Sequence, residues 1–341
     1  MHAQGLDDPR FGSALEVVRH LGCVQSQLHD MALWAVARRM TGDVTLADLQ
    51  SSFDDGEFVR THVLRPTWHF VDPADVHWLQ ALTGPRVERL MNTTNRTIDL
   101  TVDTVRRGVG VVAEALADGQ VLTRAELGSR LADAGVPTTG QALAHVVMQA
   151  EIESLVVNGP MRGRQHTYRL LPAGDDIPPR DTMLSEVARR YARGHGPFRD
   201  KDLAWWTSLT LTDSRRAIDL AGLRPLDVGG ESYWTLDEPV ESDVPPVMLL
   251  SNFDELISYA RDPEDFTDLR GSAADVMRGA GLLMVRGRLA GTWSRTSSAR
   301  RVDIVIDATP TLTGSLHRAI DLEAAAFGRF LSREAVVTFT A

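Results

Sequence analysis

Cysteine and lysine are nearly absent from this chain of 341 residues, and each absence excludes a class of site. Cys23 is the single cysteine, so neither an internal disulfide nor a zinc site with several cysteine ligands can form. Lys201 is the only lysine and no Gly-Lys-Ser/Thr triplet occurs, which excludes a P-loop. The chain also lacks a Gly-x-Ser-x-Gly elbow, a His-Glu-x-x-His motif and clustered Cys/His spacing. Cys23 itself is expected to be a small buried apolar side chain.

Long apolar stretches are missing as well. No apolar run approaches the ~20 residues that span a bilayer, and the polar N-terminal segment "MHAQGLDDPRFG" is not typical of a signal peptide. Together with the single cysteine, this predicts a cytoplasmic protein that does not contact membranes. The formal net charge of −10 argues against binding of nucleic acid by the surface as a whole, although it is compatible with a local basic face.

One apparent cofactor motif is present. The segment "GVGVVA", residues 108–113, resembles a dinucleotide-binding fingerprint. No strand precedes it and it continues into a helical pattern, so no cofactor site is expected there.

The chain repeats one order of elements three times: helices followed by a β-hairpin, which is the order of a winged helix. In the first unit, apolar spacing predicts helices over Ser13–Leu21 and Met31–Met40, separated by a connector at Gln25–Leu28. A third helix is expected in "GDVTLADLQSSF". The alternating segment Phe58–Val71 then predicts a hairpin that turns near Arg65-Pro66.

The second and third units follow the same order. Thr123 begins a capping-box pattern, and the hairpin Leu155–Leu171 is expected to turn at its Gly-Pro pair. In the third unit, Thr212 or Asp213 is expected to cap the last helix, and the Gly-Gly pair of "LDVGGESYW" to form the hairpin turn. Helices are expected over residues 109–117, 122–135, 138–155, 182–193, 198–209 and 211–222.

The pattern changes beyond the acidic, proline-containing stretch 237–246. "GLLMVRGRLAGTW" and "RRVDIVIDA" predict paired strands, "TGSLHRAIDLEAAAFGRFL" a helix and "AVVTFT" a last strand. The chain is therefore predicted to be an α+β protein with three tandem winged-helix motifs followed by a small C-terminal α+β module rich in β-hairpins. The expected division is 1–71 for the first winged helix with its glutamine pair, 72–108 for a helical bridge, 109–173 and 174–240 for the second and third winged helices, and 241–341 for the C-terminal domain.

The segment "VQSQ" places Gln25 and Gln27 two residues apart in the connector after the first helix. Glutamine does not titrate, so the pair has no acid or base of its own. Each side chain offers one carbonyl acceptor and two N–H donors, and alternate residues of an extended segment face the same side. The pair either caps the helix that starts near Asp30 or acts together in catalysis.

Four segments, in this order, resemble one family, the AlkZ-like winged-helix DNA glycosylases. They are "VQSQ", "LRPTWHFV" in the first hairpin, "LLSNFDELISYARD" at 249–262 and "GRLAGTW" at 287–293. The resemblance covers nearly the whole chain. Its Gln-x-Gln form points to the branch tied to self-resistance against azinomycin-type alkylating antibiotics. Ser251 and the pair Ile257-Ser258 depart from the usual form of the third segment.

The resemblance implies a monofunctional DNA glycosylase, a hydrolase of N-glycosyl bonds, that removes bulky N7-alkylguanine adducts from double-stranded DNA, either as monoadducts or as interstrand crosslinks. It assigns catalysis to Gln25 and Gln27, which would hold a water beneath C1′ and leave an abasic site. Because an N7-alkylated guanine is cationic and leaves as a neutral base, little acid catalysis is needed. The resemblance implies no metal or other cofactor, and a monomer that acts at the bacterial nucleoid.

The first hairpin contributes further candidates. Arg65, Thr67 and His69 alternate and are expected to share one face, where His69 could contact phosphate or the catalytic water network. The alternative is that His69 packs in a half-buried sheet beside Trp68. His62 is expected to be structural.

Asp254 and Glu255 are the carboxylates of the third segment. They could stabilise developing positive charge, or they could form either a capped helix start or an ion pair with Arg261. Trp205 and Trp206 are expected in the core. The basic side chains that either contact DNA or simply solvate the surface are Arg86, Arg89 and Arg96 on the bridge, Arg162, Arg164, His166 and Arg169 on the second hairpin, and Arg295, Arg300 and Arg301 on a C-terminal hairpin.

A second class of function is a non-catalytic winged-helix transcriptional regulator that reads the major groove. The acidic net charge disfavours tight operator binding. The recognition-helix candidate "TGQALAHVVMQAEI" also carries few base-reading Arg or Asn side chains. Formation of abasic sites in alkylated duplex discriminates between the enzyme and the regulator.

Overall fold

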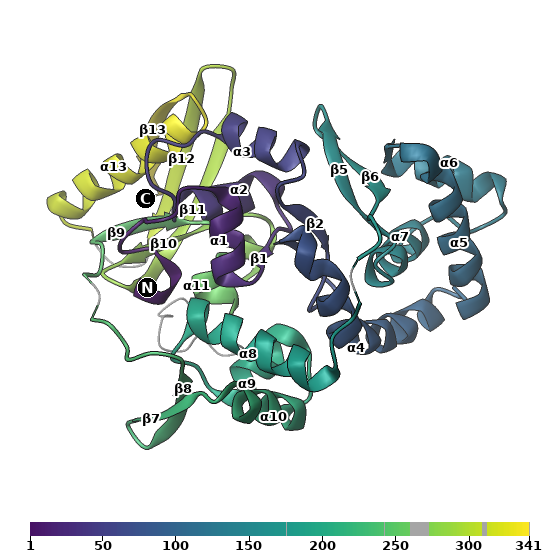
Figure 1. The fold of residues 1–341 in the computed structure, drawn as a ribbon. Helices are drawn as coiled ribbons and strands as arrows, with labels where there is room; N and C mark the ends of the chain where they lie inside the picture. The colour runs from purple at the N-terminus through teal and green to yellow at the C-terminus, as the bar shows by residue number, and fades with distance from the viewer. Residues whose placement is uncertain (175, 242, 260–272, 309–311, 341) are drawn as a thin grey trace. The chain divides into compact units, whose positions relative to one another are not determined.

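The computed structural model describes residues 1–174, 176–241, 243–259, 273–308 and 312–340 (Figure 1). The chain is a mixed α+β protein, as predicted, and it divides into two compact units. Unit 1 comprises Met1–Ser51, Tyr191–Phe198 and Arg224–Ala341, and unit 2 comprises Ser52–Arg190 and Arg199–Leu223. These units cut across the five predicted segments, so the division into three winged-helix domains stays a prediction.

The N-terminal part of unit 1 carries the glutamine pair between two helices. Ser13 caps α1 (Ala14–Leu21), as the predicted helix start requires. A two-residue strand, β1 (Val24–Gln25), follows, and α2 (His29–Ala37) begins and ends two to three residues before its predicted bounds. The same part contains a 3₁₀ turn at His2–Gln4 and α3 (Leu46–Asp54).

The C-terminal part of unit 1 is a five-stranded sheet with a helix packed on it. Its elements are β9 (Val247–Leu250), β10 (Gly281–Val285), β11 (Arg288–Ser297), β12 (Arg301–Ala308), α13 (Gly314–Phe330) and β13 (Glu334–Phe339). The strand order is β13-β12-β11-β10-β9, and only β12 and β13 are parallel, with α13 as their crossover. Figure 1 shows α13 beside these strands, and Phe327 meets Trp293 edge-on at a centroid distance of 4.9 Å.

Two short helices and a separate hairpin complete unit 1. They are α11 (Glu255–Ser258), α12 (Ala273–Met277), β7 (Arg224–Val228) and β8 (Glu231–Thr235). The β7–β8 turn is Gly229-Gly230, where both residues have positive φ, as predicted. Trp34 of α2 donates its indole N–H to Leu249 O at 2.7 Å, which ties the helix after the glutamine pair to the edge strand β9.

Unit 2 combines helices with two small sheet regions. Its elements are β2 (Val59–His62), β3 (Trp68–Val71), α4 (Val76–Thr97), α5 (Val102–Ala115), β4 (Leu122–Thr123), α6 (Arg124–Asp133), α7 (Ala142–Ile152), β5 (Val156–Arg162), β6 (Gln165–Leu170), α9 (Asp200–Thr207) and α10 (Leu211–Ala221), with 3₁₀ turns at Pro73–Asp75 and Ala117–Gly119. Helix α8 (Arg180–His195) has residues in both units. Strands β2 and β3 pair antiparallel, and β4-β6-β5 form a sheet in that order.

The segment 108–113 lies inside α5, which begins seven residues earlier than predicted, at Val102. A Cβ on Gly108 would lie 2.7 Å from Val146 Cγ1, so this glycine permits close packing of α5 on α7. Val109 and Val112 are buried in the same hydrophobic cluster. The fingerprint-like glycine therefore serves helix packing.

The second hairpin turns at a different place from the predicted one. Gly159 and Pro160 lie inside β5, at a register shift that extends to Arg162, and Gly163 with φ 64° lies in the turn. A bulged strand tolerates proline because the regular ladder is already interrupted there. The Gly-Pro pair therefore marks a bulge, and the predicted turn was wrong.

Two predictions on the third helical unit were also wrong in detail. The cap of α10 is Thr210, whose Oγ1 accepts the Asp213 N–H at 3.0 Å, and not Thr212 or Asp213. Trp206 is 1% exposed and belongs to the core as predicted, whereas Trp205 is 45% exposed. Consecutive helical residues point about 100° apart, so one of an adjacent pair commonly faces outward.

Candidate active site

The glutamine pair lies in β1 and in the turn before α2. Gln25 is 9% exposed and Gln27 is half-buried. The N-cap of α2 is Leu28, whose side chain makes no capping hydrogen bond. Neither glutamine occupies the N-cap position, which counts against the alternative that the pair merely caps the helix.

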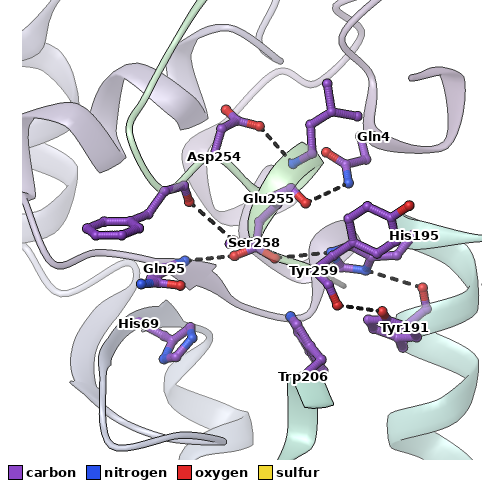
Figure 2. A network of polar contacts seen from close by, with 12 residues as sticks. Gln4, Gln25, His69, Tyr191, His195, Trp206, Asp254, Glu255, Ser258 and Tyr259 are labelled. Carbon is purple, nitrogen blue, oxygen red and sulfur yellow. Dashed lines mark hydrogen bonds and ion pairs between the residues drawn. The ribbon is translucent and has the colours of Figure 1, made fainter. Parts of the chain in front are cut away.

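Glu255, which lies 230 residues further along the chain, contacts the backbone of the glutamine pair. Its Oε1 accepts the Gln25 backbone N–H at 2.9 Å, as Figure 2 shows, and its side chain is fully buried. Gln25 ends β1 and Glu255 begins α11. The structure thus brings together the first and the third of the four segments that carry the family resemblance.

The other oxygen of Glu255 faces a histidine that no sequence motif marked. His195, at the end of α8, places Nε2 3.2 Å from Glu255 Oε2 and Nδ1 3.2 Å from Tyr191 O. Both partners are oxygen acceptors, so each contact is a hydrogen bond when the facing ring nitrogen carries a proton. Both side chains are fully buried, and an ion pair is stronger in such a medium than in water.

Two tyrosines hold the imidazole of His195 in place. Tyr191 stacks on it at a centroid distance of 4.7 Å, and Tyr259 at 5.7 Å. The Tyr191 hydroxyl donates to Tyr259 O at 2.8 Å (Figure 2). These contacts restrict rotation of the ring and keep Nε2 aimed at Glu255.

Asp254 forms a buried ion pair with Arg39; its predicted alternative partner, Arg261, lies outside the described residues. Arg39 donates from Nη1 and Nη2 to the two carboxylate oxygens at 3.0 and 2.7 Å. Asp254 also caps α11 by accepting a first-turn N–H at 3.0 Å, which confirms the capped helix start. Gln4 accepts from Arg39 at 2.9 Å and donates to Glu255 O at 3.1 Å.

These contacts form a closed circuit around the glutamine pair. The chain runs from Gln27 through α2 to Arg39, which binds Asp254, and the next residue, Glu255, binds back to Gln25. Because both carboxylates flank the start of one short helix, α11, the cap that fixes the helix also fixes the position of Glu255. Contacts therefore hold the chain on both sides of the glutamine pair, at the Gln25 backbone and at Arg39.

The three candidate residues of the first hairpin are close together, but only His69 lies in a strand. Arg65 Nη2 is 3.3 Å from His69 Nε2, and His69 Nδ1 is 3.0 Å from Thr67 O. A guanidinium can only donate, so Nε2 is the acceptor and the ring is neutral with its proton on Nδ1. His69 is fully buried, which favours the structural alternative over a phosphate contact. Arg65 and Thr67 lie in the bend between β2 and β3, so the strand alternation predicted over these three residues was wrong.

Two polar side chains of β2, His62 and Arg60, are buried and make contacts that stabilise this hairpin. His62 is 2% exposed, hydrogen-bonds to Glu151 and packs on Trp68 at a centroid distance of 4.3 Å, in line with the structural role expected of it. Arg60 lies 4.3 Å from the Trp68 ring centroid and donates to Asn158 at 2.6 Å. Burial lowers the pKa of Arg60 to about 10.

The arginines considered as DNA contacts differ in how far they are engaged within the protein. Arg162 donates to both carboxylate oxygens of Glu126, at 2.8 and 2.9 Å, and Arg301 pairs with Asp303. Burial lowers the pKa of Arg295. Among the others, Arg89, Arg96, Arg164 and Arg300 are exposed, and Arg86, His166 and Arg169 are half-buried.

Cys23 is fully buried, as expected of an apolar side chain. In the part of the chain that the structure describes, no group of three His, Cys, Asp or Glu side chains is placed to hold a metal ion. Within the same residues, no helix has both the length and the apolar character needed to cross a membrane.

Comparison with protein families gives a match to the model of the AlkZ-like DNA glycosylases over residues 18–330. The chain belongs to the AlkZ-like DNA glycosylase family. It is therefore a DNA glycosylase and its substrate is DNA. The family assignment therefore favours the enzyme over the non-catalytic transcriptional regulator.

The fold agrees with this AlkZ-like assignment. The solved structure of the Streptomyces sahachiroi DNA glycosylase AlkZ is similar with a TM-score of 0.76 and 23% sequence identity, over 100% of this chain and 97% of that chain. Comparison with curated protein sequences gives no significant match.

Three residues of this AlkZ-like site could not be found from the sequence. Gln4, Arg39 and His195 belong to no motif, and they lie far from Glu255 along the chain. The local signals in the network were Gln25 in "VQSQ" and the pair of carboxylates in "FDEL". Polar side chains of this kind are recognised once the structure shows them buried and bonded to one another.

Proposed function

We propose that this AlkZ-like glycosylase excises bulky N7-alkylguanine adducts from double-stranded DNA, as monoadducts or as interstrand crosslinks, and acts as a monomer of the Gln-x-Gln, antibiotic-resistance branch. The observation that carries the proposal is the contact of Glu255 Oε1 with the Gln25 N–H at 2.9 Å. A buried carboxylate that holds the backbone of two neutral amide side chains supports a site whose task is positioning.

Positioning suffices for a base that already carries a positive charge. Gln25 and Gln27 hold a water beneath C1′ through their carbonyl oxygens, while their N–H groups bind sugar or phosphate. The water oxygen bonds to C1′ as the C1′–N9 bond breaks, and the electron pair of that bond stays on the departing base, which becomes neutral. The water releases one proton to solvent, and an abasic site remains. An unmodified guanine lacks the positive charge and would leave as an anion, so it is not a substrate.

DNA contact is proposed for Arg164 and Arg86. Arg164 is exposed in the β5–β6 turn and Arg86 is half-buried on α4. Arg162 is proposed to fix the turn end of its hairpin through Glu126, so its contribution to DNA binding is smaller. Arg65 and Thr67 are proposed to orient His69 in the first hairpin and so to define the surface that approaches the lesion.

The test measures base excision from duplexes that carry either N7-methylguanine or a bulky N7 antibiotic adduct, scored as alkali-labile abasic sites. Wild type, Gln25→Ala, Gln27→Ala and the double variant are compared, with the exposed Gln120→Ala as the matched control. We expect the double variant to lose at least about 100-fold in single-turnover rate with unchanged duplex affinity, because one misplaced group costs about 10²-fold. Full activity of the double variant, or no excision of either adduct by wild type, would refute the proposal.

A further inference from the structure

The Glu255–His195 pair is not readily explained by a contribution to the stability of the fold. Both side chains are fully buried, with Glu255 Oε2 3.2 Å from His195 Nε2. Taking two charges out of water costs free energy that their attraction offsets only in part, and apolar residues of similar volume commonly stabilise as well or better. A buried ion pair at this place is therefore better explained by what it does for its neighbours.

We propose that Glu255 is a positioning residue of the glycosylase, held in register by His195, and that it acts through geometry and not through its negative charge. The inference rests on the proposed catalytic role of Gln25 and Gln27. Glu255 Oε1 receives the Gln25 N–H at 2.9 Å, and this acceptor fixes the backbone from which the first catalytic side chain projects. His195 fixes Oε2, so the carboxylate has one orientation.

The contacts of the Glu255 carboxylate support a positioning role over electrostatic stabilisation of the oxocarbenium ion. Glu255 is fully buried, and its two oxygens point at a backbone N–H and at an imidazole of its own unit. The main chain of Glu255 is also held, because Gln4 Nε2 donates to its carbonyl at 3.1 Å. Because both oxygens are directed at partners within the unit, the carboxylate is poorly aimed to stabilise an oxocarbenium ion on the DNA.

Two substitutions separate position from charge. Glu255→Gln keeps the length and removes the charge: its amide oxygen accepts the Gln25 N–H, and its amide N–H donates to Nε2 of a neutral His195, whose Nδ1–H still donates to Tyr191 O. Glu255→Asp keeps the charge and shortens the side chain by about 1.5 Å. The 2.9 Å bond to Gln25 then exceeds hydrogen-bond distance.

Glu323 provides a matched control in the same unit. Its Oε2 accepts the Leu249 backbone N–H at 3.1 Å and the Arg38 Nη1–H at 2.6 Å, so it also joins a strand N–H to a cationic side chain. Glu323→Asp shortens the same kind of contact without touching Gln25 or Glu255. A loss of activity caused by general loosening of the unit would appear in this variant too.

The experiment measures single-turnover excision, duplex Kd and hydrogen exchange of the peptide that contains residues 24–27. Each assay is run at least about 15 °C below the melting temperature of the variant, so that the protein stays folded. We expect Glu255→Asp to excise about 100-fold more slowly with Kd within threefold (~0.65 kcal/mol) of wild type, and to lose protection at the Gln25 amide. Glu255→Gln should restore the rate to within about tenfold of wild type and retain protection, and Glu323→Asp should match wild type in both.

Two results would overturn the inference. Either Glu255→Asp keeps its rate and its amide protection, in which case the contact is dispensable, or Glu255→Gln is as slow as Glu255→Asp, in which case the negative charge is what matters. If wild type excises neither adduct, the proposed function fails, and the exchange measurement still decides whether Glu255 and His195 position the glutamine pair.

Discussion

The buried ion pair between Arg39 and Asp254 gives the sharpest stability prediction. The perturbation is Arg39→Met, which keeps an unbranched side chain of similar length and removes the charge. The side chains of Arg39 and Asp254 are 1% and 0% exposed, and two hydrogen bonds join them. In the variant, Asp254 keeps its cap contact at the start of α11 but loses its cationic partner.

The magnitude follows from that burial. Removing one partner of a buried pair leaves an uncompensated charge in a poorly hydrated site, which costs about 3–5 kcal/mol. At ~3 °C per kcal/mol for a folding unit of this size, the melting temperature should fall by about 9–15 °C. Arg39 also donates to Ala35 O at 2.7 Å and to Gln4 at 2.9 Å, so the loss should lie toward the upper end of the range.

The assay is urea unfolding of wild type, Arg39→Met, Asp254→Asn and the double variant, arranged as a double-mutant cycle. Asparagine is as good an N-cap as aspartate, so Asp254→Asn removes the charge and leaves the cap of α11 in place. The double variant should be less destabilised than the sum of the two single variants, by about 1–3 kcal/mol, because no unpaired charge remains.

A small cost for the single variant would refute this reasoning. If the free energy of unfolding of Arg39→Met is within about 1 kcal/mol of the wild-type value, the pair behaves as a solvent-screened surface salt bridge. The circuit from α2 through Asp254 to Glu255 would then contribute little to the rigidity of the glutamine pair. The same conclusion would follow if the double variant lost as much stability as the two single variants together.

Three further predictions concern local features. Burial lowers the pKa of His20, so the unfolded state binds more protons than the folded state when the pH falls below the usual pKa of about 6.5. Stability should therefore fall as the pH drops from 7 to 5, and it should fall less in His20→Gln. Denaturant titrations at each pH measure the difference. Thr123→Ala removes a complete capping box and should cost about 1 kcal/mol in urea unfolding. Gly110→Ala, on an open helix face, should stabilise by about 0.5–1 kcal/mol, whereas Gly281→Ala, whose Cβ would lie 2.2 Å from Trp293 Nε1, should destabilise by about 1–3 kcal/mol; thermal melts compare the two.

Each of these has a clear contrary outcome. Equal pH dependence in wild type and His20→Gln would mean that other groups titrate on unfolding. An unchanged Thr123→Ala protein would show that packing alone holds the start of α6. Glycine variants with effects of the same sign would mean that the space around each backbone does not decide the outcome.

Local elements could be predicted where their signal is local. Ser13 and Thr123 begin helices as predicted, because an N-cap hydroxyl meets an N–H only three residues away. The hairpin turn at Gly229-Gly230 follows from two residues that accept positive φ. Pro160 misled because a bulge, like a turn, dispenses with a ladder hydrogen bond. Trp205 misled because an apolar pair does not say which member faces inward.

The sequence by itself determined the α+β class, the excluded chemistries and, through four short segments, the family resemblance that the family model confirms. Only the tertiary structure decided which side chains meet. Gln25 and Glu255 are 230 residues apart, and His195 reaches the same carboxylate from a third part of the chain. A hydrogen bond requires approach to about 3 Å. That approach is set by how β1, α11 and the Tyr191–His195 end of α8 pack within unit 1, and no propensity of neighbouring residues encodes it.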